Sequence, residues 1–216
     1  MRTYFFRPLA IVAVLAASAT VHAQQVAPAN RAPAASGMQF VVNLALTGGG
    51  DTIEQVEFEN GHTRNVHAGG LVQVGGGIYW QAADMPIATQ LTLNYHMDNI
   101  SASNGTKRFD RIPLEATVFY TGLPNWRFGG GVRAALSPKY KSEVDDETDY
   151  SVKFKDTVGG IVEVGYAMQA NLWLNLRYVA EKYEPSSVTY GGRSAPVVGA
   201  EKVDGSHVSL GVSYQF

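Results

Sequence analysis

The sequence predicts an all-β fold, an eight-stranded antiparallel up-and-down transmembrane β-barrel. Eight segments alternate apolar and polar side chains with a period of two, as strands with one apolar and one polar face do. The connections between them alternate between short and long. The polar faces carry glycine, serine, asparagine and a few charged residues, which is typical of a confined interior rather than of a surface in water.

Residues 1–23 have the order of a secretory signal peptide. Arg2 and Arg7 precede an apolar run that is shorter than the roughly 20 residues a membrane-spanning helix needs. We therefore expect Sec-type export, cleavage near Ala23 and a mature chain that begins at Gln24. Residues 24–37 are rich in alanine and proline and are expected to form a flexible leader, so the barrel domain should comprise residues 38–216.

Composition excludes several classes of protein. The chain has no cysteine, so neither disulfides nor a lipid-modified cysteine anchor is expected. A formal charge of -2 does not indicate a nucleic-acid partner. After the signal segment no run of 18 apolar residues remains, so membrane-spanning helices are excluded. The chain is therefore an exported all-β domain, either soluble or closed into a barrel within the outer membrane.

The expected strands are defined by their alternation. They cover residues 39–47, 71–81, 89–97, 111–120, 126–136, 157–166, 172–181 and 208–216. The connections at 82–86, 122–125 and 167–171 are short and are assigned to the periplasmic side, where both termini would also lie. The connections at 48–70, 98–110, 137–151 and 182–206 are long and polar, as external loops are. A soluble, lipocalin-like barrel with the two faces inverted is the alternative.

Aromatic residues support the membrane orientation. An expected lipid-facing girdle lies beside the short turns and consists of Phe40, Trp80, Tyr120, Trp126 and Tyr166, together with the terminal Phe216. Tyr95 and Tyr178 are candidates for the second girdle. Pro113 does not fit a central strand, so we expect a bulge there or a strand whose regular pairing begins after it. Trp173 has inward parity, which suits only a residue that caps the periplasmic end.

The interior is expected to be filled by paired charges, because an eight-stranded barrel is just wide enough for its own side chains. Counting from the turn at 122–125 places Glu115 opposite Arg133. The turn at 167–171 brings Glu163 near Asn175 and Arg177. Together with Arg127, these side chains predict a plug of arginine and glutamate pairs. A gate whose ion pairs rearrange to pass small solutes is the alternative.

The last strand carries a resemblance to a known family. Leu210, Val212, Tyr214 and Phe216 alternate with small polar residues up to the closing aromatic. With the signal segment, the eight strands and the short turns, this pattern resembles the small eight-stranded outer-membrane proteins of the OmpA and OmpX type. The resemblance covers residues 39–216. It implies a bacterial outer-membrane protein, a last strand recognised by the barrel-assembly machinery, and a role in structure or surface interaction.

The same resemblance sets further expectations. Because the chain ends with the barrel, a peptidoglycan-binding domain is not expected, and a monomer without a cofactor is. Some outer-membrane barrels modify lipids with histidine and serine or aspartate, and the candidate pairs here are His207 with Ser209 and His96 with Asp98. Neither pair has a convincing third group, so catalysis is not expected.

The long connections offer candidate binding surfaces. An acidic cluster suggests either a calcium site or a solvated loop and consists of Glu143, Asp145, Asp146, Glu147 and Asp149. Basic residues gather at the same end and are expected to pair with lipopolysaccharide phosphates. They are Arg64, Lys107, Arg108, Lys139, Lys141, Lys153, Lys155, Lys182, Arg193 and Lys202. Asn60-Gly61 predicts a hairpin within 51–66, a projection that would suit an adhesin.

Overall fold

The computed structural model describes residues 37–57, 62–102, 104–145 and 148–216. The expected signal peptide and nearly all of the leader lie outside the described residues. Within the described ranges no helix has the length and hydropathy needed to cross a membrane.

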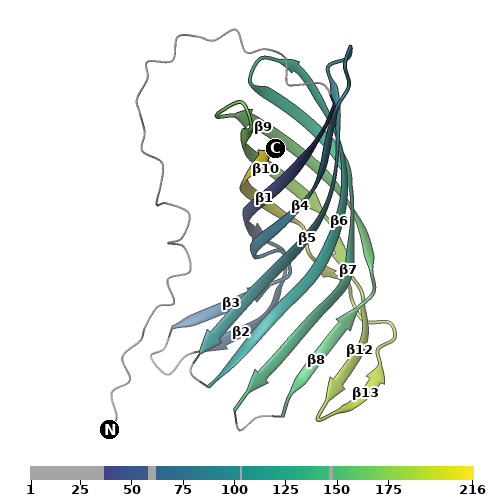
Figure 1. Ribbon diagram of the computed structural model, residues 1–216. Helices are drawn as coiled ribbons and strands as arrows, with labels where there is room; N and C mark the ends of the chain where they lie inside the picture. The colour runs from purple at the N-terminus through teal and green to yellow at the C-terminus, as the bar shows by residue number, and fades with distance from the viewer. Residues whose placement is uncertain (1–36, 58–61, 103, 146–147) are drawn as a thin grey trace. The chain divides into compact units, whose positions relative to one another are not determined.

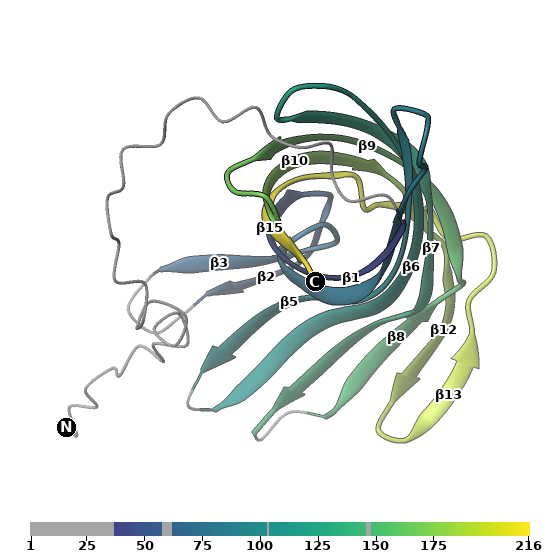
Figure 2. The ribbon, with the colours of Figure 1, turned by 45° about the horizontal axis from the view of Figure 1, so that its top comes forward.

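Eight strands close into an antiparallel barrel, and the predicted fold class is confirmed (Figure 1). The strands are β1 (Gly37–Gly49), β4 (Leu71–Gln81), β5 (Ile87–Ala102), β6 (Gly105–Leu123), β7 (Trp126–Val144), β9 (Thr157–Ala167), β10 (Leu172–Ala180) and β15 (His207–Gln215). Each pairs with its neighbour in that order, and β15 returns to pair with β1, as Figure 2 shows. Closure leaves no unpaired edge around this ring, which is the condition for spanning a lipid bilayer.

The two faces of the wall have the predicted composition. In β5 exposed and buried side chains alternate over the first ten residues. Outward side chains such as Phe40 and Leu46, which are 66% and 67% exposed, are apolar, whereas most of the buried inward ones are polar or charged. A soluble protein would hide the apolar set, so this distribution fits a wall in contact with lipid.

The strands extend beyond the barrel at one end, which we call the extended end; the opposite end, with the turns at 82–86, 124–125 and 168–171, is the short-turn end. The sequence predicted long polar loops at 98–110, 137–151 and 182–206, and this prediction was wrong because much of these ranges forms strands. β5, β6 and β7 continue through much of the first two ranges, and β8 (Tyr150–Phe154), β12 (Pro185–Tyr190) and β13 (Arg193–Pro196) add to the same sheet (Figure 2). β11 (Lys182–Tyr183) and β14 (Val203–Asp204) pair separately.

The hairpin expected within 51–66 is present as β2 (Thr52–Glu57) and β3 (Thr63–His67), while Asn60-Gly61 lies outside the described residues. The hairpin does not lengthen the barrel. It is a separate two-stranded sheet whose Val66 packs against Ile100, Phe109 and Tyr140 of the extended sheet. This hydrophobic contact explains why β5, β6 and β7 remain ordered beyond the barrel: their inward side chains find an apolar partner there.

Pro113 does not interrupt β6, and the irregularity lies beside it. The register between β6 and β7 shifts so that Ser137 and Pro138 together stand opposite Arg111, which is the pattern of a β-bulge. Ser137 has a φ of 51° at this point. The expected bulge is therefore found, but on the partner strand, and the alternative that pairing begins only after Pro113 is wrong because β6 begins at Gly105.

Glycine at position 77 is required by the close approach of β5. A Cβ there would lie 1.9 Å from the carbonyl oxygen of Leu91, which is backbone and cannot move aside. We expect Gly77→Ala to lower the free energy of unfolding by about 1–3 kcal/mol, measured by urea titration in detergent. Gly160→Ala is the matched control, since its Cβ would meet nothing within 4 Å. Equal stability of the two variants would show that β4 and β5 do not approach this closely.

Candidate functional site

The barrel interior is the candidate functional site, because it concentrates the charged side chains that lie within the wall. Four arginines face it, three of them at most 1% exposed. Four carboxylates accompany them, so the interior is formally neutral. The eight residues are Arg111, Arg127, Arg133, Arg177, Asp98, Glu115, Glu163 and Glu181.

Six of these residues form one chain of alternating charge along the barrel, which we call the ion ladder. From the short-turn end they are Arg127, Glu163, Arg177, Glu115, Arg133 and Glu181. In every step a guanidinium donates to a carboxylate, and inner members are shared between two partners. Charge-assisted pairs of this kind are the strong class of hydrogen bond.

The first half of the ladder lies nearer the short-turn end. Arg127 Nη2 donates to Glu163 Oε1 at 3.1 Å and to Asn175 Oδ1 at 2.7 Å. Glu163 also accepts from Arg177 Nε at 2.9 Å. Arg177 reaches across the lumen from β10 to Glu115 on β6, with 2.6 Å between Nη1 and Oε2. The ladder therefore joins strands that are not neighbours in the wall.

The second half continues toward the extended end. Arg133 Nη1 donates at 2.8 Å both to Glu115 Oε1 and to Gln73 Oε1. Its Nε donates at 3.0 Å to Glu181, just beyond the end of β10. Its Nη2 lies 2.9 Å from His96 Nδ1. Arg133 thus holds four other side chains around the middle of the lumen.

Aromatic rings cover the guanidinium groups at both ends of the interior. At the short-turn end, Arg127 lies between Phe119 and Trp173, with its Cζ 4.4 and 4.6 Å from the ring centroids. The Trp173 indole donates to Gln215 at 3.3 Å. Trp173 therefore points inward and covers the short-turn end of the interior, the place that its parity in the sequence predicted. The flat contacts on Arg127 also stabilise its buried Nε and Nη1 groups, which lack a hydrogen-bond partner among the described residues.

The extended end is covered in a similar way. Arg111 Cζ lies 4.8 Å from the Phe109 ring centroid and 5.9 Å from that of Tyr183. The hairpin β2–β3 is attached above it by Glu54, whose carboxylate accepts hydrogen bonds from the Tyr140 hydroxyl and the Lys107 ammonium. Burial, followed by the contact with Glu54, raises the pKa of Tyr140 above its ordinary value. Tyr140 therefore remains a neutral hydrogen-bond donor.

The structure places the other predicted residues as follows. Glu115 stands opposite Arg133 in the register of β6 and β7, and Arg177 stands opposite Glu163 between β10 and β9. The residues of the expected girdle are exposed on the outer wall near the short-turn end, and the Trp126 and Tyr166 rings lie 5.0 Å apart. Leu210, Val212, Tyr214 and Phe216 are also exposed on the outer wall; the first three belong to β15.

Sequence reasoning missed three members of the network. Glu181 and Arg111 have the inward parity of their segments, which was a usable signal, but Glu181 meets Arg133 across Gly159 of the intervening strand, and Arg111 meets its aromatic partners in the extended end. Gln73 also faces inward and bridges Arg133 and Glu115. Contacts across a lumen are not given by the register of neighbouring strands.

Within the part of the chain that the structure describes, no hydrogen bond joins the two members of either candidate catalytic pair. The His207 ring lies 2.8 Å from the carbonyl oxygen of Gly205 and packs edge-on against His96, whereas Ser209 stands opposite Arg177. His96 contacts Thr47 and two arginines, while Asp98 accepts from the backbone N–H of His67. The ring of each histidine is thus engaged with groups other than its candidate partner. Among the described residues, which omit Asp146 and Glu147 of the acidic cluster, no group of three or more possible ligands could hold a metal ion.

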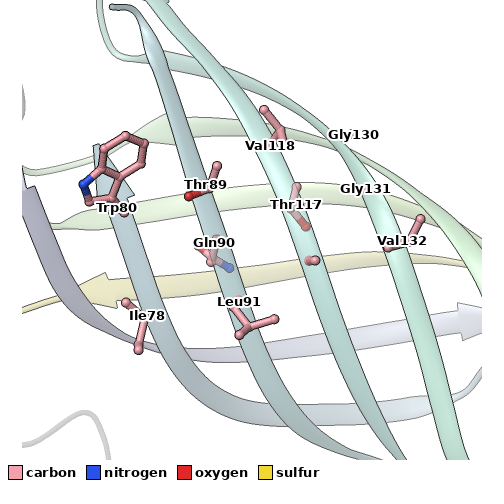
Figure 3. Close-up of a pocket in the computed structure, with 11 residues that line it drawn as sticks. Ile78, Trp80, Thr89, Gln90, Leu91, Thr117, Val118, Gly130, Gly131 and Val132 are labelled. Carbon is pink, nitrogen blue, oxygen red and sulfur yellow. The ribbon is translucent and has the colours of Figure 1, made fainter. Parts of the chain in front are cut away.

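The outer wall carries a shallow hollow across β4 to β7 (Figure 3). Ala116 and Gly130 leave space there between larger side chains such as Trp80 and Val132. The hollow is almost entirely apolar and belongs to the outer face, so it adds no polar chemistry to the interior.

These observations define a closed eight-stranded outer-membrane β-barrel with a charged interior. A family model described as the outer membrane protein beta-barrel domain matches residues 10–216, and the chain belongs to this family. It is therefore a protein of the bacterial outer membrane. No curated protein matches the sequence.

Solved structures of small outer-membrane proteins have a similar fold. Ail, the attachment invasion locus protein of Yersinia pestis, is 11% identical with a TM-score of 0.50, over 84% of this chain and 100% of Ail. Neisserial surface protein A is 12% identical with a TM-score of 0.48, over 84% and 98%. OprG from Pseudomonas aeruginosa is 14% identical with a TM-score of 0.42, over 84% and 96%. At such identities the likeness concerns the fold alone.

Removing one carboxylate from the ladder should be costly. Glu115→Ala removes one of the two carboxylates that Arg133 and Arg177 each contact and leaves one excess positive charge in the interior, so we expect the free energy of unfolding to fall by about 3–5 kcal/mol, measured by urea titration in detergent. The double variant Glu115→Ala/Arg133→Ala should regain part of this loss because the second substitution makes the interior formally neutral again. An unchanged midpoint in the single variant would contradict the buried pairing.

Proposed function

We propose that this protein is a non-conducting membrane anchor that holds an ordered sheet on the outside of the cell for structural or surface-interaction purposes. The observation that carries this proposal is the ion ladder, which extends along the interior from Arg127 to Glu181. We place the short-turn end in the periplasm and the extended end outside the cell.

A neutral, fully paired ladder favours closure over conduction. Each ladder step would have to be broken to admit a hydrated solute, and a buried charge that loses its partner costs several kcal/mol. The aromatic rings packed on Arg127 and Arg111 fill further space at the two ends of the interior. The arginine and glutamate pairs therefore act as a plug rather than as a gate.

The extracellular sheet is the part available for interaction. β13 ends the sheet order and all of its residues are exposed. Tyr190 and Val198 nearby are 63% and 92% exposed, so this edge also offers apolar side chains to a partner. An adhesin-type role through this edge is the specific form of surface interaction that we favour.

Biogenesis follows from the same placement. We infer Sec-type export with cleavage near Ala23, and recognition of the C-terminal strand by the barrel-assembly machinery. In support, β15 is the strand that closes the barrel, and the Phe216 N–H donates to the carbonyl oxygen of Phe40 at 2.9 Å. The partners of the folded protein are then outer-membrane lipid and lipopolysaccharide, with the barrel as a monomer. No catalysis is proposed, because the His207 ring lies against the Gly205 carbonyl oxygen and the His96 ring rather than against Ser209.

Conductance tests the closed interior. The refolded mature protein is expected to give no steady current in a planar lipid bilayer, because the ladder fills the lumen. Gel migration that changes on heating provides the control that the sample contains a folded barrel. A large, steady, voltage-independent current from a folded sample would overturn the proposal and favour a solute pore.

The hairpin attachment tests the ordered extracellular sheet. In Glu54→Gln, Tyr140 and Lys107 lose a charged acceptor worth about 1.5–3 kcal/mol, so amide hydrogen exchange in β2 and β3 should accelerate by about tenfold or more. Gln55→Ala, at an exposed position of the same hairpin, is the matched control. Exchange rates that match the native protein in both variants would show that Glu54 does not hold the hairpin.

A further inference from the structure

A basic cluster lies on the outer face of the extended sheet, directly above the apolar wall. Ile112 and Leu136, cross-strand partners on β6 and β7, are the last apolar pair before the bulge. Beyond the bulge, β6, β7 and β8 contribute four cationic side chains. They are Arg108, Lys139, Lys141 and Lys153.

Two of these lysines stand directly opposite each other. Lys139 and Lys153 are cross-strand partners between β7 and β8, a placement in which like charges are destabilising. Burial, with Lys141 and Lys153 as further causes, lowers the pKa of Lys139 below its ordinary value. Within the described residues neither Lys139 nor Lys153 has an ion-pair partner, whereas Lys155 shares Glu184 with Lys202.

The carboxylates near the cluster do not balance it. Asp110 pairs with Arg108 at 3.0 Å and accepts from the Tyr95 hydroxyl at 3.3 Å. Glu143 lies 3.9 Å from Lys141. Four cations against two carboxylates leave an excess of two positive charges, centred on Lys139 and Lys153. A phosphate group has the charge and the acceptor oxygens to bridge two such lysines.

The position of the cluster next to the apolar wall indicates whether the phosphate belongs to a lipid or is free in water. The Tyr95 ring lies on the outer wall and its hydroxyl reaches the cluster, as an interfacial tyrosine does. A molecule bound at Lys139 and Lys153 would also have the apolar Ile112 and Leu136 beside it. This arrangement suits a phosphate that is attached to acyl chains better than free phosphate in water.

We propose that Lys139 and Lys153, flanked by Arg108 and Lys141, bind a phosphate of an outer-leaflet lipid such as lipopolysaccharide. The site rests on the proposed function in that it needs the barrel in the membrane with its extended end outward, but it does not need a closed lumen. It assigns specific residues to the lipid partner and would hold the extracellular sheet against the membrane surface.

The test compares lipid binding by matched variants. Lys139→Gln/Lys153→Gln removes the opposed pair, and Lys182→Gln/Arg193→Gln removes two exposed charges elsewhere on the extracellular strands. Native mass spectrometry in detergent would measure the dissociation constant for bisphosphorylated lipid A, for the same lipid after phosphatase treatment, and for inorganic phosphate. Gel migration that changes on heating confirms that each variant is folded.

The native protein should prefer the phosphorylated lipid. Because each basic side chain near an anionic surface contributes about fivefold, the Lys139→Gln/Lys153→Gln variant should bind it about thirtyfold more weakly, and the control variant as the native protein does. Equal binding of both lipids, or an unaffected double lysine variant, would overturn the proposal. Binding of inorganic phosphate as tight as that of the lipid would reassign the cluster to free phosphate.

The outcomes separate this site from the proposed function. Loss of the phosphate preference with a silent bilayer recording would remove only the lipid site. A steady current from a protein that still prefers phosphorylated lipid A would remove only the closed anchor.

Discussion

A charge inside this barrel needs a partner of opposite sign, because a guanidinium or carboxylate that leaves water loses several kcal/mol of solvation. For six of the eight interior charges, the structure meets this requirement with a shared chain rather than with separate pairs. Glu115 and Glu163 each accept from two arginines, and Arg133 joins two carboxylates, Gln73 and His96. Because Arg177 spans the lumen from β10 to β6, the ladder also sets the distance between opposite walls.

The same cost of removing charge from water explains the outer surface, which, among the residues that the structure describes, has no charged side chains where it meets lipid. Where the wall meets lipid, the backbone polar groups are satisfied by the closed ring of strands and the side chains are apolar. Where the strands leave the membrane, charged residues return to the outer face, beginning with Asp110 and Lys139 just beyond the bulge. The bulge at Ser137 and Pro138 therefore lies at the change from the lipid-facing wall to the extended sheet.

The barrel could be predicted from the sequence because a period of two marks every strand that has one lipid-facing side. The segment 71–81 coincides with β4, because two glycines precede it and two alanines follow it, and the alternation stops at both ends. Contacts between neighbouring strands follow from counting residues away from a short turn, as for Glu115 and Arg133. This counting pairs only adjacent strands, and Gly159 of β9 lies between Glu181 and Arg133, which is why Glu181 was not paired with Arg133.

The extended sheet could not be predicted for a related reason. Residues 98–110 and 137–144 contain many polar and charged side chains, and their strands depend on two apolar residues far away in the sequence, Val66 of the hairpin and Ala68 just after it. The acidic cluster likewise suggested a loop, although Glu143 belongs to β7. Tertiary contacts here outweigh local composition.

The three tryptophans offer the most direct test of a filled, dry interior, since Trp80 and Trp126 face outward and Trp173 faces inward. In Trp80→Phe/Trp126→Phe, refolded into lipid bilayers, the fluorescence of Trp173 should resist quenching by both brominated lipids and aqueous iodide. Single-tryptophan variants that keep Trp80 or Trp126 should be quenched by the brominated lipids. Ready access of iodide to Trp173 would contradict the account, because it would show a water-filled lumen where the ion ladder and its aromatic cover should be.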